Sequence, residues 1–268
     1  MDVKDKTALI TGAGGGIGRG IARALAGAGC EPVIVDIDQA TAEVVAEECR
    51  ASGVRALALD CDVSRDDAVA ALPQRVADAG FGPVDILVNN VGGLTIGETH
   101  VLPTDAWRHA VDTDLLSGVR GVQAFVPGMI ERGYGHVVNT ASIGALLPVS
   151  PIGPVLCAMK AAVFGLSQSL YLSLVPQGIG VSVLCPWIVR TAASEAAHPE
   201  AMAAAGMEGS PAVEAEEVGQ IVLDAIEQGR FLLFTDPTHY ELIHERYADL
   251  DAALDGDVAY LAAFAARA

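Results

Sequence analysis

Short apolar runs alternate along the chain with longer stretches in which apolar residues recur at helical spacing. Seven runs rich in Val, Ile and Leu are predicted to be strands: residues 7–11, 32–36, 55–60, 84–89, 136–141, 180–186 and 230–235. Continuous apolar runs are typical of parallel strands that helices cover on both faces. The pattern therefore predicts one α/β domain built on a doubly wound sheet of seven parallel strands.

Helical periodicity fills most of the segments between these runs. Two long helices are expected over residues 104–132 and 154–177, and Gly178 should end the second one. Between the third and fourth strands, Ser64 is expected to cap a helix, because its hydroxyl can accept a hydrogen bond from a free backbone N–H. Pro73 should kink or break that helix, because proline has no N–H to donate.

Two segments depart from this rhythm. Residues 191–211 are rich in Ala, Met and Gly and follow the sixth strand, where we expect a lid over a ligand site. The chain from Thr238 onward has a helical pattern with two apolar patches. We therefore expect residues 1–237 to form the domain that carries the site, and residues 238–268 to be a helical extension of the same domain.

Composition narrows the classes of partner. The 268 residues are 51% hydrophobic, enough for a large buried core, and carry a formal net charge of -18. Nucleic acids and anionic membranes attract basic surfaces, so we expect neither as a partner. The five cysteines include no CxxC pair, so nothing indicates a disulfide framework or a metal site. Charged first residues and the lack of a long apolar run predict a cytoplasmic protein.

The most informative motif follows the first predicted strand. The stretch TGAGGGIG places Gly12, Gly16 and Gly18 in a GxxxGxG arrangement at the start of a helix. Glycines let a pyrophosphate approach the backbone, and the helix N-terminus supplies partial positive charge. Asp36 ends the second strand 24 residues after Gly12, where a carboxylate can bind both ribose hydroxyls and repel a 2′-phosphate. The motif predicts a Rossmann-like sheet that binds NAD; the alternative is that Asp36 only caps the following helix.

Five motifs resemble those of the short-chain dehydrogenase/reductase family, in the family's order, over almost the whole chain to about residue 237. They are TGAGGGIG, DCDV, NNVG, HVVNTAS and CPWIVRT. The resemblance implies cofactor contacts at Gly12, Gly14, Gly16, Ile17, Gly18, Asp36, Asp62, Val63, Asn89, Lys160, Pro186, Ile188 and Thr191. It also implies catalytic roles for Ser142 and Lys160, and association into homodimers or homotetramers.

Several positions depart from that family's pattern. The family's proton-transferring tyrosine, four residues before the lysine, is Leu156 here, and its helix asparagine is Asp114. Trp187 replaces a glycine, and the proline-rich loop after Ser142 is one residue longer than the family's usual spacing. These changes together favour a naturally divergent site over a single engineered substitution.

No tyrosine of this chain is placed to substitute for the missing one. The chain has five tyrosines, and none falls between Ser142 and Lys160. Tyr134 precedes the fifth strand and is expected at the opposite edge of the sheet. Tyr171 lies about 16 Å further along the helix of Lys160.

Other residues are candidates for moving a proton. Glu98 and His100 lie in the loop after the fourth strand, although simple exposure to solvent is the plainer interpretation. Cys157 adjoins residue 156 but should point about 100° away from it. Asp114 is expected to pair with Lys160, since a buried ammonium needs a partner, and such a carboxylate would make the lysine a poor acid. Alternatively, Asp114 stays solvated on a helix face.

Three functions remain open. The first is an NAD(H)-dependent oxidoreductase with Ser142, Lys160 and Asp114 as its catalytic set, acting on a small carbonyl or alcohol substrate. An apolar wall favours a hydrophobic substrate, and it is expected to contain Leu94, Ile96, Leu146, Leu147, Val149 and Trp187. The others are an NAD-binding protein without turnover, and a lyase or isomerase that uses the same pocket without net oxidation or reduction.

Overall fold

A seven-stranded parallel sheet forms the centre of the molecule. The computed structural model describes residues 1–95, 97–147, 153–192 and 212–265. The sheet has the order β3-β2-β1-β4-β5-β6-β9. Its strands are β1 (Thr7–Thr11), β2 (Glu31–Asp36), β3 (Leu57–Asp60), β4 (Val84–Asn89), β5 (Gly135–Thr140), β6 (Ile179–Cys185) and β9 (Leu232–Phe234). Each lies within two residues of its predicted bounds, so the predicted doubly wound sheet is confirmed.

The strand order reverses beside β1. This strand pairs in parallel with β2 on one side and with β4 on the other, and all five of its residues are buried. The connections that leave β1 and β4 run in opposite directions, so a crevice opens at the carboxyl ends of these two strands. The topology alone therefore places a ligand site at this edge of the sheet.

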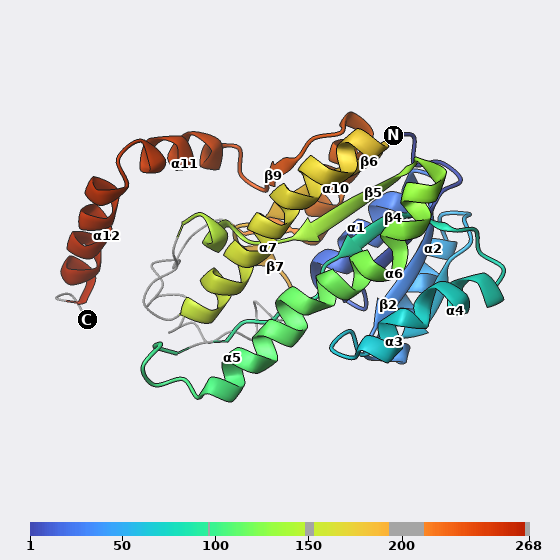
Figure 1. Ribbon diagram of the computed structural model, residues 1–268, viewed down its shortest axis with the longest axis horizontal. Helices are drawn as coiled ribbons and strands as arrows, with labels where there is room; N and C mark the ends of the chain where they lie inside the picture. Colours follow the sequence, from blue (N-terminus) through green and yellow to red (C-terminus); the bar gives the residue numbers. More distant parts are fainter. Residues whose placement is uncertain (96, 148–152, 193–211, 266–268) are drawn as a thin grey trace. The chain divides into compact units, whose positions relative to one another are not determined.

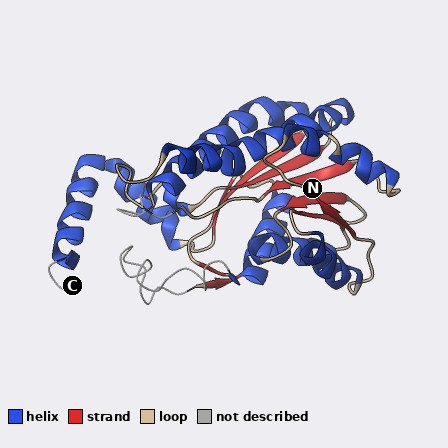
Figure 2. Ribbon diagram, turned by 90° about the horizontal axis from the view of Figure 1, so that it is seen from below, coloured by secondary structure: helices blue, strands red, loops and turns tan. Residues whose placement is uncertain are grey.

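Helices cover both faces of the sheet, above and below the strands in Figure 2. One layer contains α1 (Gly16–Gly27), α2 (Gln39–Arg50) and α10 (Ala215–Gln228). The other contains α3 (Asp66–Ala70), α4 (Leu72–Asp78), α6 (Ser117–Arg132) and α7 (Pro154–Leu174), of which α6 and α7 run beside each other in Figure 1.

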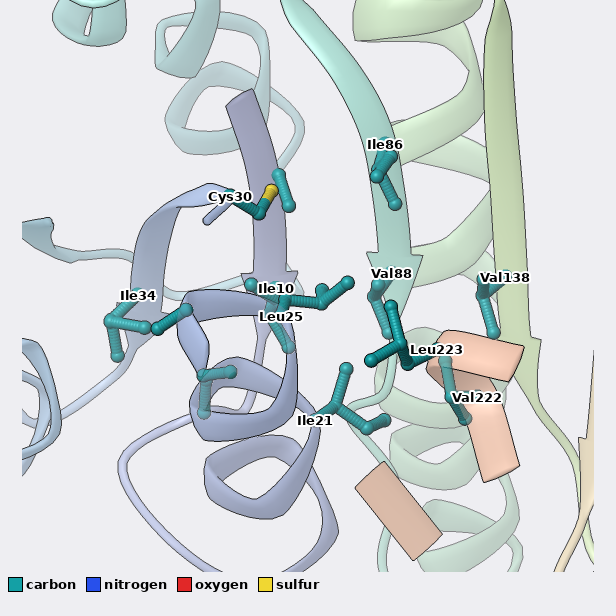
Figure 3. Packing of buried hydrophobic residues seen from close by; sticks show 14 of the residues in the cluster. Ile10, Ile21, Leu25, Cys30, Ile34, Ile86, Val88, Val138, Val222 and Leu223 are labelled. Atoms are coloured by element: carbon teal, nitrogen blue, oxygen red, sulfur yellow. The ribbon is translucent and has the colours of Figure 1, made fainter. Parts of the chain in front are cut away.

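The first layer is held by apolar side chains from two helices and the strands beneath them. Figure 3 shows Ile21 and Leu25 of α1 close to Leu223 of α10 and facing Ile10 and Val88 of the sheet. Burying one such side chain fully stabilises a fold by about 1.5–3 kcal/mol. This packing fixes the start of α1 against the end of β1.

The segment between β3 and β4 is broken at Pro73, as predicted. Pro73 lies in the first turn of α4, where its missing N–H has no helical partner to lose. The prediction that Ser64 caps the preceding helix is wrong. Arg65 occupies the N-cap position of α3, and the Ser64 hydroxyl donates instead to Asp62 Oδ1 at 2.6 Å.

The two long predicted helices are both present, and the first contains an irregularity. Residues 104–132 form α5 (Thr104–Ala110), a π-helical segment η1 (Val111–Leu116) and α6. Residues 154–177 form α7 and a short 3-10 helix η3 (Val175–Gln177), ended by Gly178 with φ 83°. A π-helical turn inside an α-helix often marks a functional position, because the wider turn redirects a side chain.

A second, two-stranded ladder was not predicted. β7 (Val189–Arg190) pairs in parallel with β8 (Val213–Glu214). Two-residue strands are too short to produce an alternating pattern that sequence can show. The predicted lid, residues 191–211, begins at the end of β7, but residues 193–211 of it lie outside the described residues.

The chain after the sheet is a separate compact unit, Asp236–Ala268, and the first unit is Met1–Thr235. The second unit is helical as expected, with α11 (Thr238–Ala248) and α12 (Leu250–Ala265) joined by an Arg246–Asp257 ion pair at 2.9 Å. Within the described residues, Pro154–Gln177 of the first unit is the one helix long and apolar enough to cross a membrane. This is weak evidence, because core helices of globular proteins pass the same test of length and composition.

Candidate active site

A cavity of about 610 Å³ opens at the carboxyl edge of the sheet. Eight of the residues predicted to bind the cofactor or to act in catalysis line it: Gly12, Gly16, Ile17, Ser142, Lys160, Pro186, Ile188 and Thr191. Seven others lie outside its lining: Gly14, Gly18, Asp36, Asp62, Val63, Asn89 and Asp114. The structure thus gathers eight of the fifteen predicted residues around a single space, from the start of α1, from α7 and from the loops after β1, β5 and β6.

The loop after β1 presents backbone groups to this cavity. Gly12 and Gly16 have φ values of 61° and 51°, in the left-handed region that glycine adopts without strain. Gly15 is the N-cap of α1 and, within the described chain, no side chain caps this helix and no acidic residue occupies its first turn. Gly15, Gly16 and Ile17 line the cavity, so free N–H groups at a helix start face a space that fits an anionic group.

The Asp36 carboxylate lies behind this loop and holds it. Its Oδ2 accepts a hydrogen bond from the Gly14 N–H at 2.8 Å. A Cβ at Gly14 would crowd Thr41 Oγ1 and lie 2.9 Å from that same oxygen, so a larger residue would displace the Asp36 carboxylate from the loop. The following helix is capped by Asp38, which accepts from Ala40 N at 2.8 Å, and not by Asp36. The alternative interpretation of Asp36 as a mere helix cap is therefore wrong.

Asp62 and Val63 lie beyond β3, beside the strand end that carries Asp36. The backbone N–H of Cys61 donates to the Asp36 carbonyl at 2.8 Å, which ties the two loops together. Asp62 Oδ1 accepts from both the hydroxyl and the backbone N–H of Ser64, and these bonds lower the pKa of the Asp62 carboxyl. Asp62 is thus fixed as an anion in this loop.

The cofactor contact assigned to Asn89 lies away from the cavity. Asn89 is buried on the α6 side of the sheet, where its Nδ2 donates to Asn139 Oδ1 at 2.9 Å. The next residue, Asn90, lines the cavity and donates to the carbonyls of Thr11 and Gly12 at 3.1 and 3.2 Å. Successive side chains alternate between the faces of a strand, so only one of two neighbouring asparagines can reach this edge. Sequence reasoning missed Asn90, although this alternation could have identified it.

Ser142 follows the end of β5 and faces the cavity. Its Oγ accepts from the backbone N–H of Gly144 at 3.1 Å, which fixes the hydroxyl at the start of the 3-10 helix η2 (Ile143–Ala145). Because that N–H uses one lone pair of Oγ, the hydroxyl proton remains available for an oxygen in the cavity. Leu156 of α7 lines the same cavity and contributes only apolar surface there.

Lys160 is buried and has no direct ion pair with Asp114. Its side chain is 5% exposed, and Nζ donates to the Thr140 carbonyl at 3.2 Å. Among the residues that the structure describes, no ion pair within 4.0 Å joins the two side chains. The Asp114 carboxylate accepts instead from the Gly93 N–H at 3.1 and 3.2 Å and from Thr113 Oγ1 at 2.8 Å. Both earlier expectations, a direct pair and a solvated Asp114, are wrong.

The electrostatics of Lys160 follow from its burial. Loss of hydration lowers the pKa of its ammonium, and the nearby Asp114 carboxylate opposes this shift without cancelling it. Asp114 therefore acts on the lysine in the expected direction, but burial has the larger effect. Asp114 is 6% exposed because it lies in the π-helical segment η1, which sequence periodicity did not show.

The loop after β6 closes the cavity from the other side. Pro186, Trp187, Ile188 and Thr191 all line it, and the Ile143 N–H donates to the Pro186 carbonyl at 3.0 Å. The N–H of Trp187 donates to Thr235 Oγ1 at 3.0 Å. This bond fixes the backbone of Trp187, at the position where the family pattern has a glycine.

The other candidates for proton transfer lie elsewhere. Glu98 and His100 are exposed and 3.4 Å apart, and Cys157 is not among the residues that line the cavity. Tyr171 packs edge-on against Phe231 with ring centroids 5.0 Å apart. Tyr134 Oη donates to the Asp2 carbonyl at 3.4 Å, at the opposite edge of the sheet as predicted.

The predicted apolar wall is present in part. Leu94 and Trp187 line the cavity, whereas Leu146 and Leu147 do not. Ile96 and Val149 lie outside the described residues. Across the described ranges, no cluster of three His, Cys, Asp or Glu side chains is arranged to hold a metal ion.

Comparison with known proteins gives the family. The family model for short chain dehydrogenases matches residues 6–201. The protein named "1-deoxy-11-beta-hydroxypentalenate dehydrogenase" from Streptomyces exfoliatus is 30% identical over 256 residues, which are 93% of this chain and 90% of that protein. The "Probable oxidoreductase EphD" of Mycobacterium tuberculosis is 38% identical over 188 residues, 70% of this chain but 31% of that protein. This chain thus spans about a third of the length of that relative.

A solved structure agrees with these sequence matches. The short chain dehydrogenase/reductase from Burkholderia phymatum, crystallised in complex with NAD, superposes with a TM-score of 0.83 and 30% identity, covering 94% of this chain and 96% of that one. The family model covers well over half of this chain, and the structure has the predicted seven-stranded parallel sheet with the predicted glycine loop at the cavity. The chain therefore belongs to the short chain dehydrogenase family, a family of oxidoreductases that use a nicotinamide cofactor.

Proposed function

We propose that this protein is an NAD(H)-dependent oxidoreductase with an atypical active site, acting on a small hydrophobic carbonyl or alcohol. The observation that carries the proposal is the shared cavity, which the glycine loop, Ser142 and Lys160 line together. A nicotinamide cofactor bound there supplies or accepts a hydride. The residues of the chain then have to bind the substrate, orient its oxygen and move one proton.

The glycine loop and Asp36 fit the two ends of the adenosine diphosphate half of NAD. Free N–H groups at Gly15, Gly16 and Ile17 suit a pyrophosphate. Asp36 uses Oδ2 for Gly14 and Oδ1 for the Asp38 N–H at 3.2 Å, and each oxygen keeps a second lone pair for a ribose hydroxyl. A fixed carboxylate at this position disfavours the 2′-phosphate of NADP by charge repulsion. This supports NAD over NADP.

Ser142 is placed to hold the substrate oxygen. Its hydroxyl is fixed by the Gly144 N–H and lies in a cavity whose other walls include Leu94, Leu156 and Trp187. An apolar space with few polar groups favours a hydrophobic substrate. The Ser142 hydroxyl then orients that substrate by its oxygen atom.

The experiment measures cofactor binding and turnover separately. Calorimetry with NAD and NADP gives the two dissociation constants, and a panel of apolar alcohols, ketones, imines and activated alkenes is followed by the absorbance of reduced nicotinamide. Ser142→Ala should lose on the order of 10²-fold in turnover while the NAD dissociation constant stays unchanged. Ser173→Ala, at an exposed serine of α7, is the matched control and should change neither. Tight NAD binding with no turnover across the panel would reject the proposal.

Leu156 favours one second candidate, an NAD-binding protein without turnover. The position that carries the family's tyrosine contributes only apolar surface to the cavity. Turnover by the wild type separates the two candidates, because a protein without turnover gives none on any substrate of the panel. Turnover by the wild type excludes this second candidate, and its absence in both the wild type and Leu156→Tyr supports it.

We also propose a cytoplasmic homodimer or homotetramer that associates through α6 and α7. Supporting this, Leu172 of α7 is 76% exposed and Ile130 of α6 is 40% exposed, although both are apolar. Sedimentation of the wild type and of Leu172→Glu tests it. The charged variant should dissociate if this surface is an interface, and unchanged sedimentation would contradict the proposal.

A further inference from the structure

Lys160 is the one ionisable side chain among the described residues that line the cavity. The other polar side chains there belong to Asn90, Thr140, Ser142, Trp187 and Thr191. Amides, aliphatic hydroxyls and the indole N–H do not titrate near neutral pH. Within the described lining, a proton that a reaction takes up or releases therefore has one titratable side chain to come from.

The helix directs the lysine toward the position of Leu156. These residues are four apart in α7 and so share one face, and helical side chains lean toward the N-terminus of their helix. Lys160 and Leu156 accordingly line the same cavity. The Lys160 Nζ is packed against the loop after β4, where a Cβ at Gly92 would come within 2.5 Å of it. The Thr140 carbonyl accounts for one of its three N–H groups.

The groups that set the charge of Lys160 can be named. Asp114 on η1 favours the ammonium through its negative charge. Cys185 on β6 faces the lysine as a neutral thiol, because burial raises the pKa of Cys185 to about 12. Asp112 on the same π-helical segment is turned outward and pairs with Arg120 at 3.0 Å. Asp114 is thus the charged neighbour that can tune the lysine, without contacting it directly.

We propose that Lys160 itself transfers the catalytic proton, the role that a tyrosine has in the family. Asp114 acts as a positioning residue, because its carboxylate favours the ammonium form of the lysine. The inference rests on the proposed oxidoreductase function. In the direction of reduction, one ammonium N–H bond breaks and an O–H bond forms on the substrate oxygen, as the carbon gains a hydride with its electron pair. The amine keeps its lone pair and regains a proton from water. In the direction of oxidation, the free amine accepts the hydroxyl proton.

The direction of the pH dependence follows from this assignment. Reduction requires the ammonium, so its rate falls as the pH rises through the pKa of Lys160. Oxidation requires the free amine, so its rate rises over the same range. Burial lowers that pKa, which brings both changes closer to neutral pH.

The chain offers an unusually direct test, because it contains only three lysines, Lys4, Lys6 and Lys160. Protein labelled with ¹³C at the lysine ε-carbon gives three NMR signals that titrate separately, and Lys160→Met assigns the third. We expect the Lys160 signal to titrate at lower pH than the signals of Lys4 and Lys6. Titration of Lys160 together with them would overturn the proposal.

Two neighbouring aspartates supply a matched pair of variants. Asp114→Asn removes the charge that favours the ammonium, so the Lys160 signal should titrate at still lower pH. The pH at which the rate of reduction falls should shift by the same amount. Asp112→Asn removes an equal charge from the same segment and should shift neither. If the NMR titration of Lys160 moves while the pH dependence of the turnover rate does not, the assignment of Lys160 as the catalytic group is overturned.

Turnover distinguishes a failure of this assignment from a failure of the proposed function. Lys160→Met should lose on the order of 10²-fold or more in kcat. A wild-type protein without turnover on any substrate of the panel rejects the oxidoreductase function, and the assignment with it. A wild-type protein that turns over, with kcat retained in Lys160→Met, rejects the assignment alone.

Discussion

Asp36 connects the phosphate loop to the choice of cofactor. Its carboxylate accepts a hydrogen bond from the Gly14 N–H and keeps lone pairs for further donors. We predict that Asp36→Asn, which keeps the acceptor but removes the charge, raises the affinity for NADP relative to NAD by about 10-fold to 100-fold. Hydrogen bonds to charged groups contribute about 1.5–3 kcal/mol, and 1.4 kcal/mol is about tenfold in affinity.

Calorimetry with both cofactors measures this ratio. Asp38→Asn is the control, since asparagine also caps helices well and Asp38 lies two residues away with its carboxylate on Ala40 N. It should leave the ratio unchanged. Equal changes in the two variants would mean that general surface charge sets the preference, and not Asp36.

His136 is a second residue whose position has a measurable consequence. It is 2% exposed in β5, and its Nε2 lies 2.8 Å from Ser182 Oγ. The Ser182 hydroxyl donates its one proton to the Arg230 carbonyl at 2.6 Å, so Nε2 must be the donor to Ser182. Burial, with a smaller effect of the amino terminus, lowers the pKa of His136 to about 4.

This pKa makes the fold sensitive to acid. The folded pKa lies below the unfolded value of about 6.5, so the stability is fully present above that pH and is lost as the pH falls toward about 4. Between pH 7 and 5 we expect a loss of about 2 kcal/mol in the free energy of unfolding from this group. Urea denaturation at both pH values measures it.

His136→Gln should remove that part of the pH dependence, whatever it does to the stability at pH 7. His109→Gln, at an exposed histidine of α5, should retain the wild-type dependence. A loss of stability between pH 7 and 5 that is the same in all three proteins would show that other groups cause it.

At the scale of elements, the contact between α1 and α10 depends on glycine. A Cβ at Gly20 would run into the backbone carbonyl of Ala215 at the start of α10, and one at Gly219 would run into the backbone of Gly20. The two helices therefore approach each other with backbone against backbone. This contact supports the start of α1, where the cofactor loop ends.

We predict that Gly20→Ala lowers the free energy of unfolding by about 1–3 kcal/mol, the usual cost of inserting a methyl group into a packed contact. Gly27→Ala, in the last turn of the same helix, is the matched control because nothing lies within 4 Å of the added Cβ. It should be neutral or stabilising by up to about 1 kcal/mol, since alanine favours helices. Urea denaturation compares the two, and an equal response would contradict the backbone contact.

The π-helical segment η1 is a structural feature that the sequence pattern did not predict. Residues 104–132 were predicted as one regular helix, in which Asp114 either paired with Lys160 or stayed solvated. The extra residue per turn buries the carboxylate against the Gly93 N–H instead. No periodicity over a six-residue segment distinguishes these two arrangements.

At the scale of the whole molecule, repulsion between the excess acidic side chains destabilises the folded state. The chain has 34 acidic and 16 basic side chains, so 18 acidic groups have no basic counterpart. Surface ion pairs such as Arg19–Glu48 contribute only about 0–1 kcal/mol each, and salt screens them as well. Repulsion between the unmatched carboxylates should therefore outweigh the pairs.

We predict that the free energy of unfolding at pH 7 rises when NaCl is added. Most of the rise should fall below about 0.15 M, where the Debye length reaches about 8 Å. Urea denaturation at several NaCl concentrations measures it, and KCl should give the same curve if screening is the cause. A stability that falls with salt would mean that the ion pairs outweigh the repulsion.

The sequence by itself determined the sheet, the place of the cofactor loop and the family. Seven apolar runs specified seven strands because a parallel strand covered on both faces must be apolar throughout. The spacing of Gly12, Gly16 and Asp36 specified the loop because each step in that motif is local in the chain.

Only the tertiary structure decided how the polar groups of the site are paired. Sequence placed Asp114 and Lys160 together but not their partners, which are the Gly93 N–H and the Thr140 carbonyl. It assigned Asn89 to the cofactor, whereas Asn90 lines the cavity. The physical reason is that a charge or hydrogen bond depends on burial and on distances of a few ångströms between segments far apart in the chain, which no local pattern encodes.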